Sequence, residues 1–247
     1  MISVHILTKN SGGTIAETLQ SLVAFPEVVI YDNGSTDDTI EICEQFMNVK
    51  VHHGRTDGFG AMHNAAAAVG MCDWVLSIDS DEVVSAELVD EILHLKLDPQ
   101  CVYAIERDNY LNGKKIRFCA GWHPDWVIRL YHRKSTRVSN DAVHEKVISE
   151  KLRVVKLNGK MKHVPYRSMD DFLEKMQKYS TLFAMQHQGK KESSFTKALV
   201  HGAVAFCKNY FFKRGFLGGR EGYILSVYNA QTTYYKYLKL AELNKKL

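Results

Sequence analysis

The chain has 247 residues, of which 45% are hydrophobic and 24% are charged. This composition predicts one large α/β domain, or one domain with an appendage, and it excludes a disordered chain. The five cysteines are scattered and include no Cys-x-x-Cys pair, so neither a disulfide framework nor a thiolate zinc site is indicated. No export signal and no apolar stretch of about 20 residues is visible, which predicts a cytoplasmic protein that does not cross a bilayer.

Charge is distributed unevenly along the chain. Residues 1–150 hold 13 Lys and Arg against 22 Asp and Glu, for a net charge of −9. Residues 151–247 hold 19 against 6, for a net charge of +13. The basic part predicts an anionic partner, which could be an acidic or phosphorylated acceptor, an anionic membrane surface or a nucleic acid.

The first hundred residues alternate between short β-rich runs and segments with helical spacing of apolar residues. Strands are expected at 2–8, 28–31 and 49–52 and within 74–82, and helices at 14–25, 40–47, 61–70 and 86–97. Strand-loop-helix units repeated at this spacing predict a parallel, right-handed α/β sheet whose ligands gather at the carboxyl ends of the strands.

Residues 74–82 carry the clearest chemical signal, because a buried strand there ends abruptly in carboxylates. Alternate residues of an extended chain point the same way, so Asp79 and Asp81 can converge on one cation while Ser80 faces elsewhere. Carboxylate ligands with open positions for phosphate suit Mg²⁺ or Mn²⁺. The alternative is that these acidic residues cap the helix that starts near Ala86.

Two common nucleotide-binding loops are missing. Neither Gly-x-Gly-x-x-Gly after the first strand nor Gly-x-x-x-x-Gly-Lys-Ser/Thr occurs. Phosphates must therefore be neutralised another way, and a metal at the acidic strand end would leave Asp32 to accept hydrogen bonds from a base or ribose. Gly58 and Gly60 precede an Ala-rich helix whose N-terminus could bind an anion, although such glycines also occur in ordinary loops.

The rest of the chain divides into two further parts. After the break at Asp98-Pro99, a hairpin is expected over 103–118 and a strand over 127–132. Helices are expected at 171–185, 195–212 and 222–243, which gives a division into 1–97, 98–168 and a helical extension at 169–247. The apolar, aromatic and basic segment 195–212 could lie in a membrane interface or could be a buried helix with a basic cap.

Four linked motifs resemble the nucleotide-sugar half of the family 2 glycosyltransferases. They are Thr8-Lys9-Asn10, Asp32 to Asp37, Gly58 to Asn64, and Asp79-Ser80-Asp81. The resemblance implies the GT-A fold, a mixed but mainly parallel sheet flanked by helices. It also implies donor binding by Thr8, Asn10, Asp32, Gly58, Gly60, Asn64, Asp79 and Ser80. A divalent metal would be held by Asp79, Asp81 and His163, although a lone histidine such as His163 is often structural. His63 stands where many relatives carry Arg or Lys.

The catalytic carboxylate is also suggested by resemblance. Arg129-Leu130-Tyr131, followed by a turn and a His-Glu pair, resembles the segment in which this fold carries its catalytic base, and Glu145 occupies that place. Glu145 could instead form a surface salt bridge. Asp125 is the second candidate for the base, and its alternatives are a turn or the orientation of two flanking tryptophans.

Nearly the whole chain resembles a narrower group. Gly-Trp-x-Pro-Asp, Val-His-Glu, His163 with Tyr166, and Arg214-Gly215-Phe216-Leu217 are similar to bacterial transferases that attach β-linked glucose, or a related sugar, to heptose of the lipopolysaccharide inner core. The resemblance implies a metal-dependent, inverting enzyme that uses UDP-glucose at the cytoplasmic face of the membrane. Alternatives are another polysaccharide or lipid-linked acceptor, or a non-enzymatic lipid- or nucleic-acid-binding module. No nucleic-acid-binding signature supports the last of these.

Overall fold

The computed structural model describes residues 1–54, 58–119, 122–140, 145–166 and 168–245. The chain divides into two compact units, each formed by two segments. Unit 1 comprises Met1–Asp108 and Asp125–His163, and unit 2 comprises Asn109–Pro124 and Val164–Leu247. The division into 1–97, 98–168 and 169–247 stays a prediction about which segments carry which function.

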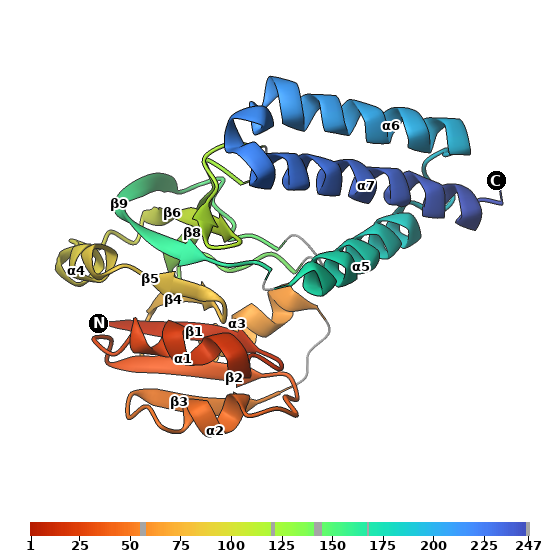
Figure 1. Ribbon diagram of the computed structural model, residues 1–247. Coiled ribbons are helices and arrows are strands. Elements are labelled where there is room, and N and C mark those ends of the chain that lie inside the picture. Colours follow the sequence, from red (N-terminus) through yellow and green to blue (C-terminus); the bar gives the residue numbers. More distant parts are fainter. Residues whose placement is uncertain (55–57, 120–121, 141–144, 167, 246–247) are drawn as a thin grey trace. The chain divides into compact units, whose positions relative to one another are not determined.

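The first half of unit 1 is a parallel α/β structure, as the alternating pattern predicted (Figure 1). Its parallel strands lie in the order β3-β2-β1-β4. The elements in chain order are β1 (Ile2–Thr8), α1 (Gly12–Gln20), β2 (Glu27–Asp32), α2 (Thr39–Cys43), β3 (Val49–His53), α3 (Phe59–Val69) and β4 (Trp74–Asp79). The helices α1 and α2 end earlier than expected, and all four strands lie where the sequence placed them.

The rest of unit 1 continues the same sheet with antiparallel strands. β8 pairs with β4 and β6 in antiparallel fashion, and the order continues β4-β8-β6-β9-β5. The further elements are β5 (Glu82–Val84), α4 (Ala86–His94), β6 (Cys101–Leu111), β8 (Trp126–His132) and β9 (Arg153–His163). The last residues of β6, and the short strand β7 (Lys114–Lys115) that pairs with them, belong to unit 2. β5 and β9 were not predicted. The described strands therefore form one mixed sheet rather than two.

The core of unit 1 is made of the inward residues of the central strands and the helices that cover them. Ile6, Ile30 and Leu76 from neighbouring parallel strands are fully buried with Leu19 of α1. Strands that are buried on both faces have continuous apolar sequences, which is why these strands could be predicted from the sequence. Each such side chain contributes roughly 1.5–3 kcal/mol by leaving water. This core fixes the strand ends on which the polar site stands.

The N-cap of helix α4 is a serine rather than one of the acidic residues at the end of β4. The side-chain oxygen of Ser85 accepts a hydrogen bond from the backbone N–H of Leu88, 3.2 Å away. Ser85 is thus the N-cap, and the alternative in which Asp79 to Glu82 caps this helix does not hold. The acidic side chains remain available for another role.

Unit 2 is mainly helical. Its helices are α5 (Met169–His187), α6 (Phe195–Cys207), the π-helical turn η1 (Lys208–Phe212), the 3-10 turn η2 (Gly215–Gly218) and α7 (Gly219–Leu243). α7 packs against both α5 and α6. Leu225 and Tyr228 of α7 form a buried cluster with Phe172 of α5 and with Trp122. Of the helices in the described part of the chain, none is long and apolar enough to cross a membrane.

Candidate active site

The carboxyl ends of three parallel strands bring the predicted polar residues together. In the register of the sheet Thr8 lies beside Asp32, and Leu7 lies beside Asp79. These ends belong to β1, β2 and β4, which are neighbours in the sheet. The expectation that Asp32 and the acidic end of β4 share one edge of the sheet is met.

The carboxylate of Asp32 is buried and holds the loop that follows β2. It accepts hydrogen bonds from the backbone N–H groups of Gly34 and Ser35, both at 2.9 Å, and from the hydroxyls of Ser35 and Thr8. Burial raises the pKa of Asp32, but these hydrogen bonds outweigh it and hold that pKa below its usual value. Asn10 fixes the same loop, because its side-chain oxygen accepts the N–H of Thr36 at 2.8 Å.

A cavity of about 390 Å³ and another of about 540 Å³ open in unit 1. The larger is lined by Asp32, Asn33, Gly34, His53 and Gly54, at the ends of β2 and β3. Its size and its place beside the carboxyl ends of the strands suit the base and ribose of a nucleotide. Contacts of Thr8, Asn10 and Asp32 with a donor stay predictions.

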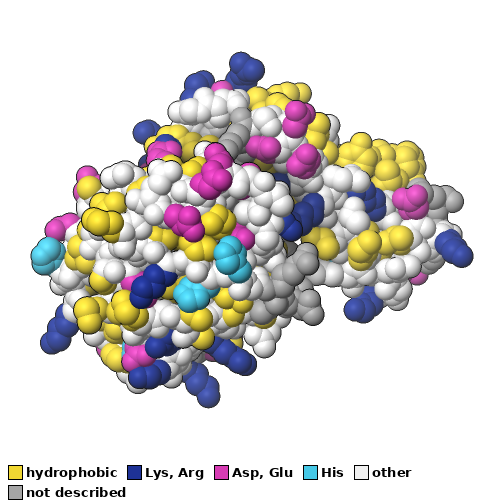
Figure 2. Space-filling view, turned by 90° about the horizontal axis from the view of Figure 1, so that it is seen from below, with side chains coloured by type: hydrophobic (Ala, Val, Ile, Leu, Met, Phe, Trp, Pro, Cys, Tyr) yellow, Lys and Arg dark blue, Asp and Glu magenta, His cyan; other side chains and the backbone are white. Residues whose placement is uncertain are grey.

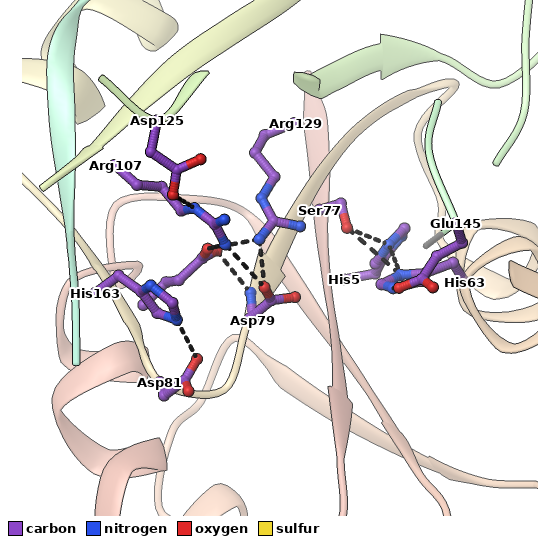
Figure 3. Close-up of polar contacts among 11 residues, drawn as sticks. His5, His63, Ser77, Asp79, Asp81, Arg107, Asp125, Arg129, Glu145 and His163 are labelled. Atoms are coloured by element: carbon purple, nitrogen blue, oxygen red, sulfur yellow. Dashed lines mark hydrogen bonds and ion pairs between the residues drawn. The ribbon is translucent and has the colours of Figure 1, made fainter. Parts of the chain in front are cut away.

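Asp79, whose side chain is 40% exposed, lies in a partly buried cluster of acidic and basic side chains (Figure 3). Arg129 of β8 contacts Asp79 and also Glu82, whose Oε1 lies 2.5 Å from the arginine Nη2. Arg107 of β6 lies 3.2 Å from the same Glu82 oxygen and 2.9 Å from Asp125 Oδ2. Two guanidinium groups thus face three carboxylates, which leaves one negative charge in excess when all are ionised.

Burial and the neighbouring charges separate the pKa values of Glu82 and Asp79. Glu82 is 0% exposed, and burial together with the nearby charge of Asp79 raises its pKa to about 7, against the opposing effect of Arg129. Burial acts in the same direction on Asp79, but the charge and hydrogen bond of Arg129 hold the pKa of Asp79 well below its usual value. Glu82 is therefore the carboxyl that takes up the excess proton near neutral pH.

Asp81 and His163 form the second part of the site. Asp81 follows β4, and His163 ends β9, which pairs with β5. The His163 Nε2 lies 3.7 Å from Asp81 Oδ1 (Figure 3). For metal–ligand bonds of about 2.1 Å, adjacent ligands of an octahedral ion are about 3.0 Å apart and opposite ligands about 4.2 Å apart. The observed 3.7 Å lies between these values, so the two side chains would have to move by about half an ångström or more to share one such ion. Within the described residues no group of three or more potential ligands occurs.

Ser80 lies between the two aspartates and forms hydrogen bonds with residues that follow β1. Its hydroxyl accepts a hydrogen bond from Ser11 at 2.9 Å, and its carbonyl accepts one from Thr18 at 3.1 Å. These contacts agree with the expectation that Ser80 faces away from a cation. Its contact with a donor stays a prediction.

Glu145 lies beside a buried histidine pair. Its Oε1 is 3.9 Å from His63 Nε2, and His63 Nδ1 is 3.1 Å from His5 Nε2 (Figure 3). The same His5 nitrogen lies 2.9 Å from the hydroxyl of Ser77. Burial lowers the pKa of His63 to about 4, so this imidazole is neutral at pH 7. Glu145 thus has a neutral neighbour in His63.

Two residues expected to bind the donor hold the segment that precedes Glu145. The side chain of Asn64 makes two hydrogen bonds with the backbone of Val138, at 2.9 and 3.0 Å. A Cβ at Gly60 would lie 1.8 Å from the carbonyl oxygen of Ser139, so only glycine admits this segment to α3. Val138 in turn bridges Val147. Donor contacts of Gly58, Gly60 and Asn64 stay predictions; His144 lies outside the described residues.

Several polar residues of the site were not predicted as functional. Arg107, Arg129 and Glu82 form the charged cluster, and His5 supports His63. A signal existed for Arg129, because it lies within the β-forming run Val-Ile-Arg-Leu-Tyr, and a buried arginine requires a carboxylate. The sequence did not show which carboxylate, because the partners come from strands far apart in the chain.

Comparisons with known proteins identify a family, related sequences and a structure with the same fold. The family model for glycosyl transferase family 2 matches residues 3–156. An uncharacterised glycosyltransferase of Rickettsia typhi is 32% identical, over 99% of this chain and 88% of its own. LpsC of Rhizobium meliloti, a lipopolysaccharide core biosynthesis glycosyltransferase, is 26% identical over 90% of this chain and 85% of its own. The mannosyltransferase PcManGT from Pyrobaculum calidifontis, solved with GDP-Man and Mn²⁺, superposes with a TM-score of 0.54 at 15% identity, covering 99% of this chain and 86% of that one.

The fold and the matches define a sugar-transferring enzyme of the GT-A class. The chain belongs to glycosyltransferase family 2. The predicted fold class, enzyme class and family resemblance are thereby confirmed, and the reading as a non-enzymatic binding module does not hold.

Proposed function

We propose that this chain is an inverting, metal-dependent transferase that moves a sugar, glucose in the first instance, from UDP to a heptose of a lipopolysaccharide core. The observation that carries the proposal is the pairing of Asp81 with His163 at the tip of the central strand, together with the separate carboxylate of Glu145. The name of LpsC supports a core glycan as the acceptor. Another polysaccharide or a lipid-linked glycan is the alternative acceptor.

Asp81 and His163 are the residues that would hold the metal. One carboxylate and one imidazole leave positions for phosphate oxygens and water, which suits Mn²⁺ or Mg²⁺. The Mn²⁺ in the complex of the mannosyltransferase PcManGT supports a divalent ion here. Such an ion would stabilise the negative charge on the departing diphosphate. Asp79, whose Oδ2 is engaged by Arg129, would assist from its remaining oxygen.

Glu145 is the proposed general base. Its carboxylate would accept the proton of the acceptor hydroxyl while the new bond forms to the anomeric carbon and the bond from that carbon to the diphosphate breaks on the opposite face. A well-placed base contributes roughly 100-fold to 10,000-fold in rate. The neutral His63 helps, because a cation at that place would reduce the affinity of Glu145 for the proton. Asp125 is the weaker candidate, because Arg107 already donates to one of its oxygens.

The test separates binding from chemistry. Glu145→Gln should bind UDP with Mn²⁺ as the wild type does, measured by titration calorimetry, while transfer falls by at least about 100-fold. Asp125→Asn is the matched control and should retain more of the transfer rate than Glu145→Gln. Transfer by Glu145→Gln near the wild-type rate would assign the base elsewhere. The acceptor is identified by mass spectrometry of core glycans from cells with and without the protein.

A further inference from the structure

The outer side of α6 and the turns that follow it expose large hydrophobic side chains. Each has an exposed fraction between 48% and 81%. We call the following set the α6 surface: Phe195, Leu199, Val200, Val204, Phe211, Phe212, Phe216 and Leu217. Exposed hydrophobic side chains, yellow in Figure 2, also occur on the face of the molecule drawn there. In the α6 surface they follow one another along a single helix and the turns that extend it.

The exposure follows from the packing of α6 on α7. The residues of α6 that are buried are small, namely Ala198 and Gly202. A Cβ at Gly202 would lie 3.1 Å from the Cβ of Tyr234 on α7, so the two helices approach closely along this seam. The large apolar side chains of α6 therefore face away from α7. The alternative of a buried helix that closes the core does not hold for this segment.

The charge of this segment has one sign. Residues 195–220 contain no Asp or Glu and five basic residues, Lys197, Lys208, Lys213, Arg214 and Arg220, all of them exposed. Lys197 lies 3.9 Å from Glu192, just outside the segment. An exposed apolar stripe with flanking cations is the pattern of a helix that lies in the plane of a membrane interface. Its cations then meet the phosphates of anionic headgroups.

We propose that the α6 surface is a docking site for a lipid bilayer that carries anionic headgroups. The apolar side chains enter the boundary between headgroups and acyl chains, and the cations remain at the phosphates. A second copy of this chain is a poorer occupant, because two such surfaces would place like charges against each other. The proposal does not depend on the donor, metal or base proposed above, because it concerns unit 2 alone.

The experiment is cosedimentation of the whole chain with vesicles of phosphatidylcholine, with or without about 30% phosphatidylglycerol. The variant Lys208→Glu, Lys213→Glu, Arg214→Glu should lose binding to the anionic vesicles by at least about a hundredfold, since each cation near such a surface contributes roughly fivefold. The control Lys96→Glu, Lys151→Glu, Lys190→Glu changes the net charge equally, with exposed lysines outside 195–220, and should bind as the wild type does.

A second variant tests the apolar part. Val200→Ser with Val204→Ser changes two exposed side chains, so folding should be retained, as circular dichroism will show, while vesicle binding falls. Absence of wild-type binding to anionic vesicles would overturn the proposal, as would an equal loss in the control. A dimer in sedimentation velocity that this variant dissociates would assign the α6 surface to a second copy instead. Transfer to a water-soluble acceptor fragment should be unchanged in both variants, which separates this result from failure of the proposed function.

Discussion

Replacement of Arg129 by methionine is expected to destabilise unit 1 strongly. The guanidinium of Arg129 contacts Asp79 and Glu82 together, and Glu82 is completely buried. Methionine would fill much of the space but would leave two acidic groups without their main cation. The remaining cation, Arg107, lies 3.2 Å from Glu82 but 3.8 Å from Asp79, so it compensates only in part.

The expected magnitude follows from the cost of an uncompensated buried charge. Removal of one partner from a buried pair costs about 3–5 kcal/mol, and the lower end applies here because Arg107 remains. For a chain of this length that cost corresponds to a fall in melting temperature of roughly 6–20 °C. The loss should be larger at pH 8 than at pH 6, because the pKa of Glu82 is about 7 and its carboxyl is ionised at the higher pH.

Urea unfolding at both pH values, followed by circular dichroism, measures this loss. Arg129→Lys keeps the charge but not the two-pronged contact and should lose less. Glu82→Gln introduced together with Arg129→Met removes one of the stranded carboxylates and should restore about 1–3 kcal/mol relative to Arg129→Met alone. A loss below about 1 kcal/mol in Arg129→Met, or a loss unaffected by Glu82→Gln, would refute the assignment of this cluster as a buried ion-pair network.

Three further predictions concern single residues. The pKa of Glu82 is about 7, against an ordinary 4.5, so the folded state holds this proton more tightly than the unfolded chain does. The proton therefore adds to the free energy of unfolding a contribution that is full below pH 4.5 and falls as the pH rises to 7. Glu82→Gln should flatten this decline in urea titrations, and equal slopes in the variant and the wild type would contradict it. Gly60→Ala, whose Cβ would meet a backbone carbonyl at 1.8 Å, should cost about 1–3 kcal/mol in a thermal melt, whereas Gly218→Ala, with nothing within 4 Å, should cost little. His63→Lys should place a cation near Glu145 and move the acid limb of the pH–rate profile to lower pH by about one pH unit, and an unmoved limb would remove His63 from the environment of the base.

The parallel part of the fold was predictable because local and global signals agree there. Residues 2–8 were expected to form a strand, and β1 is Ile2–Thr8. A strand buried on both faces needs a continuous apolar run, and turn-forming residues end each run. The local sequence is therefore enough to predict both the strand and the residues at which it ends.

The strand β9 could not be predicted in the same way. Its Asn158-Gly159 pair favours a turn in isolation. In the structure a Cβ at Gly159 would lie 2.4 Å from the Cα of Leu88, so the glycine is required where α4 crosses the strand. The carboxylate of Glu91 on α4 accepts the backbone N–H of Gly159 at 2.8 Å, which replaces a hydrogen bond that a strand partner would give. The Asn158-Gly159 pair is therefore explained by tertiary contacts with α4 and not by a local turn.

The acidic half of the site was predictable, and the basic half was not. Asp79 and Asp81 stand at the end of a strong strand signal, which suffices to place them at the edge of the sheet. The expected alternation does not extend to Asp81, because β4 ends at Asp79 and residues 80–81 form a turn, so Asp79 contacts Arg129 while Asp81 lies near His163. Arg129 reaches Asp79 only because β8 inserts beside β4 in antiparallel register, and these two residues are 50 positions apart in the chain. No local pattern encodes that neighbour, so the pairing of Asp79 with Arg129 required the structure.

The most direct test of the account is the position of the metal. Crystals of this chain soaked with UDP and Mn²⁺ and measured at the manganese absorption edge would locate the ion without assumptions about the mechanism. We predict one anomalous peak within bonding distance of both Asp81 and His163, with the diphosphate bound to the same ion. A peak bound by neither residue, with the diphosphate resting against other side chains, would contradict the proposed site.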